Sequence, residues 1–171
     1  FPDGYLEADA PTPYDSQYAN VIAYSTKQTV EFVRWIQQQP FYENTTIVII
    51  GDHLSMDKNF FKDFDPNYQR TTFNLILNPA PTVQNTPAQY YSNRTWAVFD
   101  MFPTILTSMG VEIEGNRLGL GTNLFSGEKT LFEQDGVAYV NEELNNRSNF
   151  FNKHILLSRY KPYEGKNITT Y

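Results

Sequence analysis

The sequence contains no cysteine, so neither a disulfide framework nor a thiolate metal site is available to it. It also has no run of about 18 apolar residues, and no segment is therefore predicted to span a membrane. The formal net charge of −6 argues against a nucleic-acid-binding surface, which needs a basic stripe. An anionic substrate would have to be met by local positive charge, and a bound cation is one source of it.

What is present is the composition of a globular protein. Hydrophobic residues make up 40% of the 171 residues and aromatic residues 16%, which suits one domain with a core and is too short for two. No internal repeat, low-complexity tract or Gly/Ser linker divides the chain. We predict one unit over residues 1–157, followed by a polar tail over 158–171. Because the chain opens on Phe1 and not on methionine, we interpret it as a fragment or processed product.

Hydrophobic spacing predicts a helix in the first third of the chain. Apolar side chains recur at helical spacing from Tyr18 to Ile36. Asp15 and Ser16 are candidate N-caps, and Pro40 predicts an end near residue 39.

A β-branched block over 45–50 predicts a buried strand of a parallel sheet, and helix, short loop and strand together form half of an α/β crossover unit. Gly51 is expected to break this strand at a sharp turn. A second strand is predicted over 70–78. Further helices are expected around 57–61, over 100–109 with Gly110 at the C-terminus, and over 136–152.

Asp52 and His53 follow the first strand directly, at its carboxyl end, where ligands bind in open α/β sheets. A carboxylate beside an imidazole suits a divalent metal. The alternative is that Asp52 caps the next segment and His53 is merely solvated. A metal site also needs three or more ligands. The other candidate ligands are His154, Asp57, Asp63 and Asp65, and nothing in their spacing requires them to bind a metal.

The glycine-rich stretch 115–121 offers a second place to bind an anion, through backbone N–H groups and Arg117. It matches neither a Walker loop nor a dinucleotide fingerprint, so we favour a structural turn. No Gly-x-Ser-x-Gly elbow is present, and no serine or threonine nucleophile is predicted within the chain.

Three segments, taken in order, resemble the sulfatase-like catalytic domain of bacterial phosphoglycerol transferases, in the alkaline phosphatase superfamily. Lipoteichoic acid synthase is a more distant member of the same group. The segments are Thr45–His53, Phe99–Gly110 and Gly115–Leu124. Gly-Asp-His with Asp-x-Phe-Pro-Thr-Ile-Leu is typical of the superfamily, and the Arg-Leu-Gly-Leu-Gly-Thr-Asn-Leu run narrows it to the transferases.

The resemblance implies an α/β fold, namely the C-terminal part of a sandwich with helices around a mostly parallel sheet. It implies that Asp52 and His53 bind a divalent cation, Mn or Mg rather than Zn. It places the threonine nucleophile, a metal-binding glutamate and a phosphate-contacting histidine upstream of Phe1. No catalytic nucleophile is then expected in this chain, and residues 1–171 alone should be inactive. Arg70 and Arg117 are candidates for substrate contact or, alternatively, surface ion-pair partners.

The implied reaction moves phosphoglycerol from phosphatidylglycerol to a cell-envelope polysaccharide or glycerol-phosphate acceptor. The implied setting is the extracytoplasmic face of a bacterial membrane, with anchoring helices upstream and the N-terminal remainder of the domain as a partner. The alternatives are a sulfatase or phosphoethanolamine transferase of the same superfamily, or a secreted non-catalytic module that retains the fold.

Overall fold

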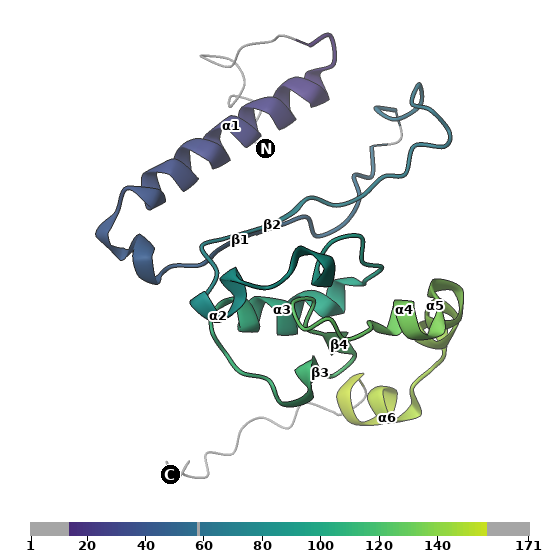
Figure 1. Cartoon of the computed structure of the whole chain (residues 1–171). Coiled ribbons are helices and arrows are strands. Elements are labelled where there is room, and N and C mark those ends of the chain that lie inside the picture. Colours follow the sequence, from purple (N-terminus) through teal and green to yellow (C-terminus); the bar gives the residue numbers. More distant parts are fainter. Residues whose placement is uncertain (1–13, 58, 157–171) are drawn as a thin grey trace, which may run out of the picture.

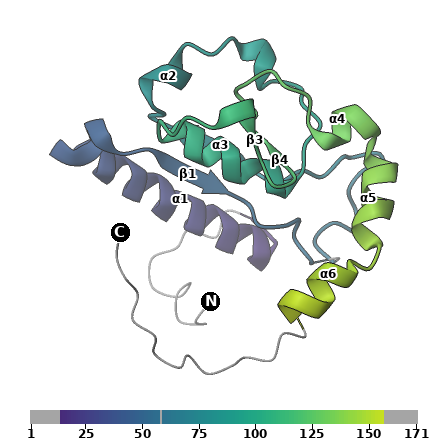
Figure 2. The ribbon, with the colours of Figure 1, turned by 90° about the horizontal axis from the view of Figure 1, so that it is seen from below.

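The computed structural model describes residues 14–57 and 59–156 (Figure 1). Residues 1–13 and the predicted tail 158–171 lie outside this part. A long helix, α1 (Gln17–Gln37), lies on one side of a two-stranded sheet formed by β1 (Ile47–Ile50) and β2 (Asn74–Leu77). On the other side are the helix α3 (Met101–Ser108) and the hairpin of β3 (Arg117–Leu118) and β4 (Gly121–Thr122) (Figure 2).

The helix predicted from the hydrophobic spacing is confirmed as α1. Ser16 is its N-cap and accepts a hydrogen bond from the Ala19 N–H at 3.3 Å. The helix ends at Gln37, two residues before the predicted end, and a 3₁₀ turn, η2 (Pro40–Asn44), leads to β1. Asn20 is the only buried residue of α1, because its side-chain amide bonds both backbone groups of Tyr14. The apolar face of α1 is partly exposed within the described part of the chain: Ile22 and Phe32 are exposed, and the other apolar positions are half-buried.

The sheet differs from the predicted parallel arrangement. β1 and β2 pair antiparallel, with Ile47 opposite Leu77 and Ile50 opposite Asn74. A parallel pair needs a crossover, usually a helix, and in the described residues between the strands there is none; the expected helix at 57–61 is a series of turns. Apolar content predicts that a segment is a strand, but it does not fix the direction of the partner. Neither strand is fully buried in the described structure, and Ile50 is 43% exposed.

The sequence predicted that Gly51 would break the strand, but the β ladder continues through this residue. Its N–H donates to the Phe73 carbonyl at 2.8 Å, so the pairing continues one residue beyond β1. Its φ is not positive, and a Cβ there would lie 3.2 Å from the Thr72 Cβ. Close approach to the facing strand, and not a special backbone conformation, accounts for a small residue at this position.

The predicted helix over 100–109 is confirmed as α3, preceded by the 3₁₀ turn η4 (Val98–Asp100). It ends in a Schellman motif: the Val111 N–H donates to the Leu106 carbonyl and the Gly110 N–H to the Thr107 carbonyl. Gly110 has φ +91°, the left-handed conformation that the motif needs. Gly110 therefore ends helix α3, as the sequence predicted.

The remaining elements are short. Between β2 and α3 lie α2 (Pro81–Gln84) and η3 (Ala88–Tyr90), and η5 (Glu114–Asn116) precedes the hairpin. The predicted helix over 136–152 is interrupted. It consists of α5 (Val137–Asn145), preceded by α4 (Leu131–Asp135) and followed by α6 (Asn149–Phe151) and the π-helical turn η6 (Asn152–Leu156). Asn146 and Ser148 are extended, and the Ser148 hydroxyl accepts from the Phe151 N–H at 3.0 Å, which starts a new helix.

The second and third resemblance segments form one buried interlock. The Asp100 carboxylate accepts from the Thr122 N–H at 2.7 Å and from the Ala97 N–H at 2.8 Å. The Thr104 hydroxyl donates to the Asp100 carbonyl at 2.6 Å and accepts from the Leu124 N–H at 3.0 Å. Asp100 and Thr122 are fully buried. Helix α3 and strand β4 are therefore held together by side chains of the family-like motifs themselves.

The first segment joins the same helix. The Thr46 hydroxyl lies within hydrogen-bonding distance of the Asn78 carbonyl, at 3.1 Å, and of the Ser108 carbonyl, at 3.2 Å. The Ala80 N–H donates to the Ser108 carbonyl at 2.7 Å. The end of α3 thus connects to both strands of the larger sheet, and all three segments meet at this helix.

Gly121 allows the hairpin to approach α3, and we expect Gly121→Ala to destabilise the chain by about 2–3 kcal/mol, the cost of overpacking a dense core. A Cβ at this position would lie 2.1 Å from the Phe99 carbonyl oxygen, which is backbone and cannot rotate away. Gly119→Ala is the matched control: its φ is +58° with open space around it, so strain alone should cost about 1 kcal/mol. Urea unfolding of both variants measures the difference, and equal losses would refute the steric explanation.

Candidate metal and substrate site

Asp52 and His53 lie where the sequence placed them, one residue beyond the end of the β1 ladder. Both are exposed: the side chains retain 86% and 57% of their accessible surface. The Asp52 Oδ1 accepts from the His53 N–H at 2.9 Å, and its Oδ2 lies 3.4 Å from the His53 Nε2. The two side chains therefore present one oxygen and one nitrogen on the same side of the turn.

The geometry of this pair fits a divalent cation. The His53 Nδ1 lies 2.8 Å from the Leu54 carbonyl, which only accepts hydrogen bonds, so this contact places the proton on Nδ1 and leaves the Nε2 lone pair free. Two ligands each about 2.1 Å from one metal lie roughly 3.0–3.4 Å apart, which matches the Nε2–Oδ2 separation. The described residues contain no group of three His, Cys, Asp or Glu side chains suited to a metal. A complete site would need further ligands.

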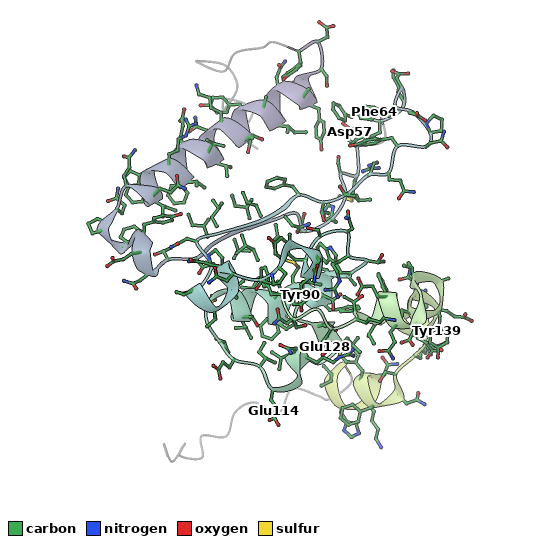
Figure 3. All side chains as sticks on the ribbon, viewed as in Figure 1. Asp57, Phe64, Tyr90, Glu114, Glu128 and Tyr139 are labelled. Carbon is green, nitrogen blue, oxygen red and sulfur yellow. The ribbon has the colours of Figure 1, made fainter. Side chains whose placement is uncertain are left out.

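Arg70 lines the same cleft as Asp52. Its guanidinium lies 4.0 Å above the centre of the Phe61 ring and donates one hydrogen bond to the Ser55 carbonyl. These contacts hold the half-buried side chain while leaving most of its five N–H donors for other partners. The loop that carries them extends beyond the strands, where Asp57 and Phe64 are labelled (Figure 3).

Arg117 does not line the cleft that Asp52 and Arg70 share. It is exposed on β3 and donates to the Lys129 carbonyl at 2.9 Å. The glycine-rich stretch around it is the turn η5 followed by the hairpin; Gly115 in η5 has φ +67° and Gly119 in the hairpin has φ +58°. The stretch forms a turn, as favoured from sequence, and anion binding by its backbone stays a prediction. A substrate contact by Arg117 stays a prediction. His154 is likewise distant in the chain, and its ring packs against Phe150 at 4.8 Å.

The cleft has a volume of about 1230 Å³ and extends from the end of β1 to the start of α5. Its floor is apolar, with side chains from both strands and from α3. Its charged side chains are Asp52, Arg70 and Arg94. Arg94 is saturated by protein partners, so Asp52 and Arg70 are the two charges that are available to a ligand.

Sequence analysis missed the ion pair of Arg94 and Glu133. Arg94 donates to both Glu133 carboxylate oxygens at 2.7 Å and to the carbonyls of Tyr90 and Glu128, two residues labelled in Figure 3. The hydrogen bond from Arg94 lowers the Glu133 pKa to about 2. Only the local part had a sequence signal: Thr130 and Glu133 have the spacing of a capping box, and the structure forms that box.

The pKa of the Asp100 carboxyl is also changed by its environment. Burial raises its pKa above the ordinary value of 3.8, while the N–H donors of Ala97 and Thr122 act in the opposite direction. Asp100 is 0% exposed, and its carboxylate accepts hydrogen bonds from the backbone N–H groups of Ala97 and Thr122. The role of Asp100 is structural, although its motif was first noted because it is typical of the superfamily.

Comparison with known proteins gives the family. Residues 1–111 match the family model described as Sulfatase. The chain belongs to the sulfatase family. This confirms the resemblance deduced from the three segments, and it accords with a chain that mixes helices and strands in the α/β class.

Relatives with named activities match this sulfatase-family chain at low identity. It is 24% identical over 133 residues to phosphoglycerol transferase I of Salmonella choleraesuis, covering 74% of the chain and 16% of the relative. It is 24% identical over 135 residues to the lipoteichoic acid synthase-like YvgJ of Bacillus subtilis, covering 74% and 22%. Lipoteichoic acid synthase of Staphylococcus saprophyticus is 29% identical over 121 residues, covering 64% and 18%.

The chain thus spans between a sixth and about a fifth of the length of these curated relatives. No solved structure matches it significantly. Among the described residues, no helix is long and apolar enough to cross a membrane.

Proposed function

We propose that this chain supplies half of the metal site of a phosphoglycerol transferase acting on phosphatidylglycerol. The observation that carries the proposal is the Asp52–His53 donor pair, 3.4 Å apart, whose Asp52 lines a cleft together with Arg70. A cation-binding pair beside a guanidinium suits a phosphodiester, whose negative charge both would neutralise. The names of the relatives, phosphoglycerol transferase I and lipoteichoic acid synthase, support this substrate class.

In the proposed reaction, Asp52 Oδ2 and His53 Nε2 hold a divalent cation, Mn²⁺ or Mg²⁺, and Arg70 contacts a phosphate oxygen. The cation, when bound, would lower the pKa of a hydroxyl nucleophile and offset phosphate charge. A threonine outside this chain attacks phosphorus, and the bond to the diacylglycerol oxygen breaks as that oxygen takes a proton. An acceptor hydroxyl then attacks the glycerophospho-threonine and restores the threonine.

The proposal includes where and with what the chain acts. The remainder of the same domain contributes the other ligands and packs on this chain, and the acceptor is a cell-envelope polysaccharide or glycerol phosphate. We place the reaction at the extracytoplasmic face of a bacterial membrane. Residues 1–171 alone are expected to be inactive, since the described part holds two ligands. A sulfatase is the second candidate, because that is the name of the matching family.

The test is Mn²⁺ binding by the full-length protein. We expect Asp52→Asn and His53→Gln each to weaken Mn²⁺ binding by about 10–100-fold, measured by calorimetry, with phosphatidylglycerol consumption falling in parallel. Both side chains are exposed, so the melting temperature without metal should not change.

Glu31→Gln provides the matched control, because Glu31 is an exposed carboxylate on α1 and is not a candidate ligand. It should bind Mn²⁺ as the wild type does. Unchanged Mn²⁺ affinity in Asp52→Asn would remove the metal role and favour a non-catalytic module. Hydrolysis of an aryl sulfate with no action on phosphatidylglycerol would instead identify a sulfatase.

A further inference from the structure

Tyr18 joins helix α1 to the loop that follows the metal-binding pair. It lies in the first turn of α1, and its hydroxyl oxygen is 2.5 Å from the Oγ of Ser55, a residue 37 positions further along the chain. Its ring meets the Phe60 ring edge-on, with 5.0 Å between the ring centres. Helical spacing accounts for the ring of Tyr18 as an apolar position, but it does not account for this hydrogen bond of the hydroxyl.

Both contacts of Tyr18 lead to Arg70. The Ser55 carbonyl accepts a hydrogen bond from the Arg70 guanidinium, which lies 4.0 Å above the centre of the Phe61 ring. The Phe61 and Phe60 rings are 4.9 Å apart and nearly perpendicular. All of these residues are half-buried. Tyr18 therefore contacts, directly or through Phe60, both groups that hold the guanidinium in place.

We propose that Tyr18 is a positioning residue, whose hydroxyl fixes Ser55 and through it the Arg70 guanidinium for contact with a phosphate oxygen. A long arginine side chain loses rotational freedom when it is held for a single contact. If the protein already holds the guanidinium, less of this entropy is lost when substrate binds, and binding is tighter. The inference rests on the proposed function, in which Arg70 contacts phosphate. It adds that α1 supports substrate binding from outside the cleft.

The experiment measures turnover of phosphatidylglycerol in mixed micelles by the full-length protein with Mn²⁺. Tyr18→Phe removes the hydroxyl and keeps the ring against Phe60. We expect its KM to rise about threefold to tenfold, as for the loss of one hydrogen bond. Its kcat should change by less than about twofold, because the interaction supports binding of substrate and transition state alike. An unchanged KM in Tyr18→Phe would overturn the proposal.

A double-mutant cycle shows whether the hydrogen bond itself is responsible. Ser55→Ala removes the other partner and should raise KM by a similar factor, and the double variant with Tyr18→Phe should be no worse than either single variant. Tyr42→Phe is the matched control, because Tyr42 is also half-buried and lies on η2, beyond the opposite end of α1. Its KM should equal that of the wild type. Two KM increases that multiply in the double variant would contradict the proposal.

Mn²⁺ binding distinguishes Arg70 from the metal pair as the group that Tyr18 supports. Because Asp52 and His53 do not contact Tyr18, the Mn²⁺ affinity of Tyr18→Phe, measured by calorimetry, should equal that of the wild type. A loss of Mn²⁺ affinity as large as the rise in KM would show that Tyr18 holds the metal-binding turn, and the proposal would be wrong.

A measurement that needs no turnover separates this inference from the proposed function. Phenylglyoxal modifies arginine side chains, and peptide mass spectrometry gives its rate at each arginine. Tyr18→Phe should raise the rate at Arg70 about threefold relative to exposed Arg117, since the guanidinium is held less firmly. An unchanged rate would overturn the proposal. If the rate rises but Arg70→Met leaves KM unchanged, Tyr18 holds Arg70 as inferred, and the phosphate contact of the proposed function is what fails.

Discussion

Asp100→Ala is expected to destabilise the chain by about 3–5 kcal/mol, because it leaves the N–H groups of Ala97 and Thr122 without an acceptor. Each unpaired buried donor costs about 1–3 kcal/mol. Both bonds are short, at 2.8 and 2.7 Å, and the Thr122 side lies in fully buried surroundings. The free energy of unfolding from urea titration measures the loss. It should appear without any direct effect on the Asp52–His53 pair.

Asp100→Asn separates hydrogen bonding from charge. The amide keeps one acceptor oxygen, so one of the two N–H donors remains satisfied and the loss should be about half that of alanine. Asparagine also avoids burying a charge, the effect that raises the Asp100 pKa. Asp63→Ala, at a carboxylate that is 85% exposed, should change stability by less than about 0.5 kcal/mol. Asp100→Ala with wild-type stability would show that the interlock of α3 and β4 contributes nothing.

The local elements of this fold could be predicted because their signals are local. The helical spacing from Tyr18 to Ile36, the Ser16 cap and the Gly110 terminus each depend on residues within a few positions, and all three are confirmed. The direction of the sheet depends on how the chain returns between 51 and 73, which apolar content does not encode. The antiparallel pairing was missed for that reason.

The candidate site shows the same division. Gly-Asp-His could be found because its donors are adjacent in sequence, and the structure places them 3.4 Å apart. The shared cleft of Asp52 and Arg70 depends on the segment between the strands, and its lining by Trp96 depends on a segment further along the chain. Neither has a sequence pattern. Asp100 and Thr104 were noted as part of a family motif, and only the structure reveals that their side chains bond backbone groups of α3 and the hairpin segment.

Arg94→Met is the other large expected effect, with a loss of about 3–5 kcal/mol, because it leaves the Glu133 carboxylate unpaired in a partly buried place. The Arg94 side chain is 9% exposed and that of Glu133 20% exposed, and two parallel hydrogen bonds of 2.7 Å join them. Arg94 also links the Tyr90 and Glu128 carbonyls, so it connects the segment before η4 to the segment before α4. Lys27→Met is the control: its pair with Glu31 is exposed at 3.8 Å and should contribute less than about 1 kcal/mol.

The pH dependence of this pair has a definite sign. The folded state lowers the Glu133 pKa from 4.5 to about 2, so Glu133 stabilises the fold fully above pH 4.5 and progressively loses that contribution as the pH falls towards 2. The stability difference between wild type and Glu133→Gln should therefore be constant near neutral pH and shrink between pH 4.5 and 2. Asp100, whose pKa is raised, affects the pH dependence of stability in the opposite direction. Because both proteins contain Asp100, taking their difference removes most of this effect. A difference that stays constant down to pH 2 would show that the Glu133 carboxylate is not held by Arg94 in solution.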